Sequence, residues 1–220
     1  MQCMVLIDGR EVKAKAGSNL LWTALDSGFY IPNLCAIRNN PKPFASCRLC
    51  FVEISGATEP VTACTVAVAD GLNVTLQSAA INRLRKSSFD LLMSNHHLDC
   101  SHCDRNRKCD LQQIAHAEHF KLSNRRLKKI DMNYPVDTSH SLIVLDRNKC
   151  VLCGRCIWVC QHVGVGVLDF AYRGISTVVS TFAGAPLSET ECNSCLACVA
   201  VCPVGALYLK RPQPKVKHAR

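Results

Sequence analysis

Cysteine is the residue type in this sequence whose number and spacing most clearly point to chemistry. Of 220 residues 16 are cysteines, and the stretch CVLCGRCIWVC at 150–160 returns as CNSCLACVAVCP at 192–203. The N-terminus is charged within ten residues, without the apolar core of a signal peptide, and no run of about 18 apolar residues predicts a membrane span. We therefore expect a cytoplasmic protein. Because that compartment keeps thiols reduced, metal ligation is their expected role.

Both runs have the spacing C-x2-C-x2-C-x3-C, which is typical of two 4Fe-4S clusters in bacterial ferredoxins. Three thiolates from one compact loop can reach three corners of a cubane. If the chain then turns helical, the fourth cysteine lies one turn further along the same helix face and points to the neighbouring cluster. Zinc sites more often show isolated C-x2-C pairs. The spacing thus predicts two ligand sets, Cys150, Cys153, Cys156 with Cys202, and Cys192, Cys195, Cys198 with Cys160.

A second cysteine group lies upstream in the stretch HHLDCSHCDRNRKC and is one ligand short of a 4Fe-4S site. A histidine is the nearest candidate for the fourth ligand, and spacing alone does not choose between His96, His97 and His102. For this segment taken alone, a zinc site of three cysteines and one histidine is the alternative. The three cysteines are Cys100, Cys103 and Cys109.

The remaining spacing, C-x11-C-x2-C-x13-C, offers a central pair flanked by two distant cysteines, which suits a 2Fe-2S cluster. The segments MVLIDG and REVKAKAG alternate like two hairpin strands around Asp8-Gly9. The stretch SNLLWTALDSG predicts a short helix with Ser18 as N-cap and Gly28 as its stop. A hairpin followed by a helix fits a β-grasp ferredoxin module. The four cysteines are Cys35, Cys47, Cys50 and Cys64.

Fifteen cysteines and one histidine therefore supply sixteen ligands for four clusters. Cys3 is left over, at the start of the first predicted strand, where a small buried hydrophobic residue is expected. The formal net charge of +9 raises the alternative of a zinc-stapled module that binds nucleic acid. Bound clusters with their thiolates carry roughly −7 in total, however, which would leave about +2. We expect the basic excess to offset cluster charge, without nucleic acid as a partner.

No motif indicates substrate chemistry. The sequence GVG at 164–166 is a partial match to a nucleotide fingerprint, but it lies between the two cysteine runs and is expected to be a connecting loop. His116 and His119, with Glu118, are expected on a solvated helix face. The chain alone is therefore expected to transfer electrons without a catalytic residue.

Taken together, these motifs resemble a known family. H-x3-C-x2-C-x5-C starting at His96 and followed by DLQ at 110–112 is similar to the histidine-ligated segment of the large iron-sulfur subunit of respiratory complex I. It is equally similar to the N-terminal part of iron-only hydrogenases. The upstream spacing, with IP at 31–32 and CRLC at 47–50, resembles the 2Fe-2S domain of the same proteins. The resemblance covers about residues 3 to 210.

The resemblance implies that the fourth ligand of the middle cluster is His96 and neither His97 nor His102. One feature departs from the family, which usually has glycine shortly before the second cysteine of the 2Fe-2S loop. This sequence has Ala45 and Ser46 there. The backbone conformation of this loop is therefore left open.

The resemblance also implies partners. In complex I and in iron-only hydrogenases a large further domain follows, whereas this sequence is expected to end in the basic tail RPQPKVKHAR. Length and cluster number look most like the diaphorase (gamma) subunit of NAD-reducing nickel-iron hydrogenases. Such a subunit relays electrons between a flavoprotein that binds NAD(H) and the hydrogenase small subunit or an equivalent catalytic module. The alternative is the same role in an NAD-dependent formate dehydrogenase or an electron-bifurcating hydrogenase.

The predicted fold class is α+β. We expect a β-grasp 2Fe-2S domain, a helical segment with the His-Cys3 site, a linker and a bacterial-type domain with two 4Fe-4S clusters and a basic tail. The basic stretch at 121–131 is expected to be a solvated linker more than a docking patch. The expected boundaries are 1–78, 79–120, 121–140 and 141–220.

Overall fold

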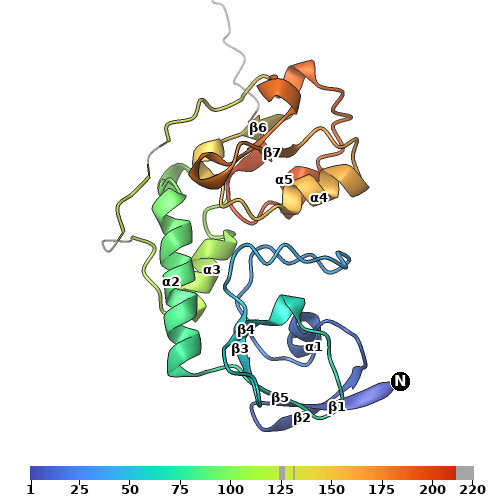
Figure 1. Cartoon of the computed structure of the whole chain (residues 1–220). Coiled ribbons are helices and arrows are strands. Elements are labelled where there is room, and N and C mark those ends of the chain that lie inside the picture. The colour runs from blue at the N-terminus through green and yellow to red at the C-terminus, as the bar shows by residue number, and fades with distance from the viewer. Residues whose placement is uncertain (124–126, 131, 212–220) are drawn as a thin grey trace, which may run out of the picture.

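The computed structural model describes residues 1–123, 127–130 and 132–211. Its sheet-containing N-terminal part lies at one end, two helices of the middle segment follow, and the C-terminal part lies at the other end (Figure 1). The α+β fold class is thus confirmed. Within these ranges, the helices lack the combination of length and apolar character needed to cross a membrane. The predicted basic tail begins at Arg211, which pairs with Asp104 at 2.7 Å, and its residues 212–220 lie outside the described residues.

The N-terminal part is built on a five-stranded sheet in the order β2-β1-β5-β3-β4. The predicted hairpin is confirmed, because Asp8 and Gly9 both adopt positive φ values of 45° and 77° between its strands. Cys3 is buried in the first strand, as expected. The strands are β1 Gln2–Ile7, β2 Arg10–Lys15, β3 Phe51–Ile54, β4 Val61–Thr62 and β5 Leu72–Thr75.

Helix α1 (Leu20–Asp26) packs its apolar side against this sheet. Its N-cap is Asn19 and not the predicted Ser18, because a β-bridge to Ala67 keeps the backbone of Asn19 extended. The Asn19 side chain accepts hydrogen bonds from the first helical amides, and its Nδ2 donates to the Cys64 carbonyl at 2.6 Å. The start of α1 is therefore tied to the turn that carries Cys64.

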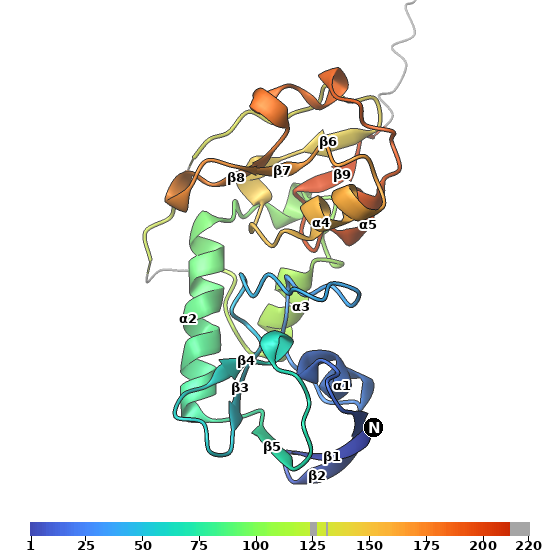
Figure 2. The same cartoon turned by 45° about the vertical axis from the view of Figure 1, so that its right-hand side comes forward.

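Beyond the sheet, the long helix α2 (Ala79–Asn95) and the shorter α3 (Asp110–Ala117) connect the two ends of the molecule (Figure 2). Ser78 caps α2 by accepting a hydrogen bond from the Ile81 amide at 3.1 Å. The ring centroid of Phe89 on α2 lies 5.3 Å from that of Phe120, which follows α3. The cysteine-bearing turn η2 (Cys100–His102) lies between the two helices in the sequence.

The C-terminal part contains two copies of a turn-and-helix unit. Strands β6 and β9 pair antiparallel, as do β7 and β8 in the segment between the repeats. Its elements are β6 Ile143–Leu145, α4 Arg155–His162, β7 Asp169–Ala171, β8 Val178–Ser180, α5 Ala197–Val201 and β9 Leu207–Leu209. The 3-10 turns among the described residues are η1 Ala63–Thr65, η2, η3 Arg147–Lys149, η4 Gly174–Ser176, η5 Phe182–Gly184 and η6 Leu187–Glu189.

The described part of the expected linker is held to both neighbours. The amide of Ile130 donates to the Ser94 carbonyl at the end of α2, at 2.8 Å. The backbone of Tyr134 exchanges two hydrogen bonds with the Asn148 side chain, each at 2.8 Å. These bonds fix the path between α3 and the C-terminal part. Residues 124–126 and 131 of the basic stretch lie outside the described residues.

The cap at α1 generates the first prediction. Asn19→Ala removes the capping oxygen and leaves the Cys64 carbonyl without its amide donor, a loss of about 1–2 kcal/mol. The amides of α1 should then exchange with solvent deuterium about tenfold faster, since 1.4 kcal/mol corresponds to a factor of ten. Ser18→Ala is the control and should change exchange less. An equal effect of both substitutions would contradict the assignment of the cap.

Candidate metal centres

The N-terminal site gathers four buried cysteines from distant parts of the chain. Cys35 and Cys47 come from the loop before the third strand, with their sulfurs 3.4 Å apart. Their hydrogen bond lowers the pKa of Cys35 to about 6 and raises that of Cys47. Cys50 directly precedes β3, and Cys64 lies in η1. Their mutual interaction raises the pKa of Cys50 and lowers that of Cys64. None of the four is more than 4% exposed.

The loop around Cys47 adopts the bend for which the family usually has glycine. Ala45 adopts φ +49° and Arg48 φ +53°, so non-glycine residues hold the left-handed conformation on both sides of the cysteine. For an L-residue this conformation costs about 1–2 kcal/mol. The loop therefore keeps a bend that glycine would adopt without strain.

Two cavities in the C-terminal part are each lined by four cysteines. Cys156 and Cys160 lie one turn apart on α4, and they face different cavities. Apart from Asn193, the other lining residues are apolar or glycine, and Leu207 of β9 lines both cavities. The first cavity is lined by Cys150, Cys153, Cys156 and Cys202, and the second by Cys160, Cys192, Cys195 and Cys198.

Burial decides which charge state these thiols can hold. Desolvation raises the pKa values of Cys150, Cys153 and Cys198 to about 12. Four thiolates in one apolar cavity are therefore unfavourable unless a cationic metal centre shares it. Sulfur-only donors in a dry cavity fit an iron-sulfur cluster.

Glycine at two positions lets the backbone approach cysteine sulfurs, and sequence reasoning missed both roles. A Cβ at Gly164 would lie 2.9 Å from the Cys160 carbonyl and 3.5 Å from the Cys195 sulfur. A Cβ at Gly205 would lie 2.4 Å from the Cys103 sulfur. The GVG segment is a connecting loop, as expected, but it also packs against the second cavity. Nothing in the local sequence signals these contacts, because they join distant segments.

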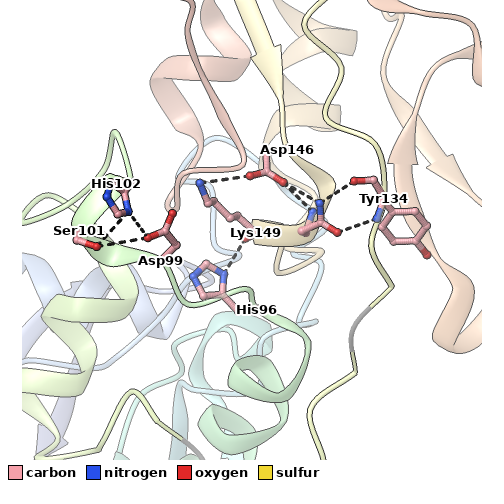
Figure 3. A network of polar contacts seen from close by, with 8 residues as sticks. His96, Asp99, Ser101, His102, Tyr134, Asp146 and Lys149 are labelled. Carbon is pink, nitrogen blue, oxygen red and sulfur yellow. Dashed lines mark hydrogen bonds and ion pairs between the residues drawn. The ribbon is translucent and has the colours of Figure 1, made fainter.

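The middle site is defined by the sequence, in which Cys100, Cys103 and Cys109 follow a buried histidine, His96. His96 is 7% exposed, and its Nδ1 lies 2.8 Å from the Lys149 carbonyl (Figure 3). Because a carbonyl only accepts hydrogen bonds, Nδ1 carries the proton and Nε2 keeps its lone pair. Burial also lowers the pKa of His96, which favours the neutral imidazole. A neutral imidazole with its second nitrogen fixed by a hydrogen bond is the form that binds metals.

The other two candidate histidines face solvent. His97 is exposed, and the His102 side chain is 81% exposed and hydrogen-bonded to Asp99 at 2.8 Å. Figure 3 shows His102 turned toward Asp99 and away from His96. Within the described residues, no three histidine, cysteine or carboxylate side chains form a group that could hold a metal ion. The sulfurs of the two C-terminal runs instead line the two cavities, and those of Cys35 and Cys47 face each other. The structure does not bring His96, Cys100, Cys103 and Cys109 together as one such group.

The histidines at the end of α3 are solvated, as predicted, but their neighbour is not. His116 and His119 are exposed. The Glu118 side chain is only 8% exposed and lies 3.5 Å from Arg85. The prediction of a solvated Glu118 is therefore wrong, because this carboxylate pairs with a buried cation from α2.

Polar contacts join the middle site to the first C-terminal cavity. The Arg105 guanidinium donates to the Cys202 carbonyl at 2.6 Å, and the Asp110 amide donates to the Pro203 carbonyl at 2.9 Å. The Asp110 carboxylate also lies 3.4 Å from Arg155, which stands between two cysteines of that cavity. The segment of the middle site thus contacts the backbone of the segment that carries Cys202 of this cavity.

Three family models match successive parts of the chain. Residues 2–79 match a 2Fe-2S iron-sulfur cluster binding domain, and residues 149–206 match a 4Fe-4S dicluster domain. Between them, residues 85–121 match the NADH-ubiquinone oxidoreductase-G iron-sulfur binding region. A 2Fe-2S-binding domain and 4Fe-4S-binding domains are therefore present.

Comparisons over the whole chain find subunits of NAD-reducing hydrogenases. The gamma subunit of the NAD-reducing hydrogenase HoxS of Cupriavidus necator is 28% identical over 96% of this chain and 88% of its own length. A crystal structure of NAD+-reducing [NiFe]-hydrogenase in the H2-reduced state contains a chain with a TM-score of 0.86 and 28% identity, covering 94% of this chain and 87% of that one. This chain is a homologue of these iron-sulfur subunits.

Longer relatives share the same region. The NADPH-Fe(3+) oxidoreductase subunit alpha of Geobacter sulfurreducens is 36% identical over 93% of this chain, and this homologue spans only 24% of that relative. A subunit of an NADH-quinone oxidoreductase of Rhizobium meliloti is 37% identical over 92% of this chain and 23% of its own length. The chain thus spans about a quarter of the length of the first curated relatives that it matches.

The strained loop next to Cys47 generates the second prediction. Ala45→Gly should stabilise the N-terminal domain by about 1 kcal/mol, because glycine adopts φ +49° without the steric cost of a Cβ. Anaerobic urea unfolding, followed by the visible absorption of the 2Fe-2S domain, measures the change. Ala57→Gly is a matched control, because Ala57 is exposed and outside the left-handed region. If Ala45→Gly stabilises the domain no more than Ala57→Gly does, strain at Ala45 is refuted.

Proposed function

We propose that this chain is an electron-transfer subunit that relays electrons through four iron-sulfur clusters, between a subunit that binds flavin and NAD(H) and a hydrogenase module. The observation that carries the proposal is the exchange of cysteines between the two C-terminal cavities, each lined by three cysteines of one run and the last cysteine of the other. This arrangement suits paired clusters at short distance.

The proposed ligand sets are those that the cysteine spacing and the resemblance predict. One 2Fe-2S cluster is held by Cys35, Cys47, Cys50 and Cys64. One 4Fe-4S cluster is held by His96, Cys100, Cys103 and Cys109. The other two are held by the cysteines that line the two C-terminal cavities, Cys150, Cys153, Cys156 and Cys202 in one, and Cys160, Cys192, Cys195 and Cys198 in the other. The proposed domain boundaries remain 1–78, 79–120 and 141–220, with the segment 121–140 between the last two.

Contacts between neighbouring sites support a continuous relay. The ring of Phe44, in the loop of the N-terminal site, lies 3.0 Å from where a Cβ of Gly154 would be, beside the first C-terminal cavity. Gly205 approaches the sulfur of Cys103, and Leu207 lies between the two C-terminal cavities. One continuous core of buried residues contains Cys35, Cys109 and cysteines of both runs.

Clusters bound at these sites supply one-electron transfer, and the chain's residues tune and separate them. The apolar cavity walls bury most of the cysteines, although Cys195 is exposed. His96 replaces a thiolate by a neutral imidazole, which makes its site about one charge unit less negative. The residues of this chain bind and bury these groups, and substrate chemistry belongs to the partners.

A nickel-iron hydrogenase is the proposed partner because the HoxS gamma subunit matches this chain over nearly the whole length of both. The same relay in an NAD-dependent formate dehydrogenase or an electron-bifurcating hydrogenase is the second candidate. Other complexes do contain this region, because the NADP-reducing hydrogenase subunit HndD of Solidesulfovibrio fructosivorans is 36% identical over 92% of this chain and 35% of its own length. We propose a cytoplasmic location for the complex.

The metals of the native complex test this proposal. Anaerobic purification of the complex should yield a brown protein with about 14 iron atoms per copy of this chain, plus the iron of its partners, and nickel in proportion. Molybdenum or tungsten without nickel would indicate that the partner is a formate dehydrogenase and not a nickel-iron hydrogenase. A colourless protein with zinc would overturn the electron-transfer function and favour a zinc-stapled module.

The imidazole at the middle site generates a further prediction. His96→Cys adds one thiolate, so the midpoint potential of that 4Fe-4S cluster should fall, or the cluster should be lost, because the hydrogen bond to the Lys149 carbonyl disappears. Redox titration followed by electron paramagnetic resonance measures it. His102→Cys is the matched control and should change nothing, since His102 faces solvent. An unchanged midpoint and spectrum in His96→Cys would refute the assignment.

A further inference from the structure

Arg85 is a buried cation that none of the proposed ligand sets uses. Its side chain on α2 is 0% exposed and lies between the N-terminal sheet and the end of α3. The Nη2 atom donates to the Phe51 carbonyl at 2.9 Å, and Nη1 lies 3.5 Å from the Glu118 carboxylate. Its Nε has no hydrogen-bond partner among the residues that the structure describes.

Stability alone does not explain this arginine. Burial of an ion pair is often no better than an apolar pair of the same volume, because both charges lose their hydration. A buried N–H without a partner costs about 1–3 kcal/mol more. A methionine at position 85 would fill the space without either cost. The guanidinium also stays charged, although burial lowers its pKa.

The orientation of Arg85 directs its positive charge toward the N-terminal site. Phe51, which accepts the Nη2 hydrogen bond, directly follows Cys50. The guanidinium is therefore held one residue along the backbone from the proposed ligand Cys50. Glu118 neutralises the guanidinium from its other side, at Nη1.

We propose that Arg85 raises the midpoint potential of the 2Fe-2S cluster, and that Glu118 limits how much of this positive charge the cluster senses. The inference rests on the proposed ligand set of the N-terminal site. Reduction adds a negative charge to the cluster, and a fixed cation in a medium of low polarity stabilises that charge. Arg85 acts through space and through the Cys50–Phe51 backbone, without coordinating iron.

Two substitutions with opposite expected signs test this role. Arg85→Met should lower the equilibrium constant for reduction of the 2Fe-2S cluster about tenfold. For one electron this lowers the midpoint potential by about 59 mV. Glu118→Gln should raise the midpoint, because it leaves the cation without its neutralising partner. The measurement is a redox titration of the 2Fe-2S signal by electron paramagnetic resonance, on the full chain prepared anaerobically.

Two further variants serve as controls. Arg85→Lys keeps the charge and should stay close to the parent protein. Arg83→Gln removes an exposed charge from the same helix and should leave the midpoint unchanged. A purely structural role for Arg85 would move the midpoints of Arg85→Met and Glu118→Gln in the same direction, or broaden both signals.

Each outcome of these measurements either supports or refutes the proposed role of Arg85 or the proposed function. Absence of a 2Fe-2S signal from the parent protein would refute the proposed function itself. A normal parent signal with unshifted or equally shifted variants would refute the role of Arg85 alone. If Arg85→Met does not fold, the sign of the Glu118→Gln shift decides: a rise supports the proposal, and no rise overturns it.

Discussion

Burial of thiols against one another in apolar surroundings is the constraint on which the rest of the structure depends. Each C-terminal cavity brings four cysteines together among aliphatic side chains, and burial raises the pKa of Cys150 and Cys153 to about 12. Without a metal centre these groups stay neutral thiols, because four thiolates would be unfavourable in one apolar cavity. With a cluster bound, the same dry walls hold it and set its potential. Cluster binding and folding should therefore be coupled.

Other local features serve this constraint. Ala45 and Arg48 hold left-handed backbone so that the loop can turn around Cys47, and Asn19 ties the start of α1 to the turn of Cys64. Gly164 and Gly205 leave room for cysteine sulfurs. Strain, capping and close approach thus occur where the chain closes around a site. The sites lie next to one another because these same segments form their shared walls.

Much of this arrangement could be predicted from the sequence, where the signal is local. The Asp8-Gly9 hairpin follows from turn chemistry, and cysteine spacing groups the same residues that line the two C-terminal cavities. Contacts between distant segments could not be predicted. A bridge to Ala67 moves the cap of α1 by one residue, and Glu118 is buried because a helix about thirty residues earlier in the chain presents Arg85. The hydrophobic periodicity of a segment does not indicate which distant segment it contacts.

The central claim is that four iron-sulfur clusters occupy these groups of cysteines and His96. Crystals of the anaerobically prepared chain, measured on both sides of the iron and zinc absorption edges, test it most directly. We predict four iron peaks: one among Cys35 and its three partners, one beside the Nε2 atom of His96, and one in each C-terminal cavity. Peaks at the zinc edge, or fewer than four iron sites in fully loaded protein, would contradict the account.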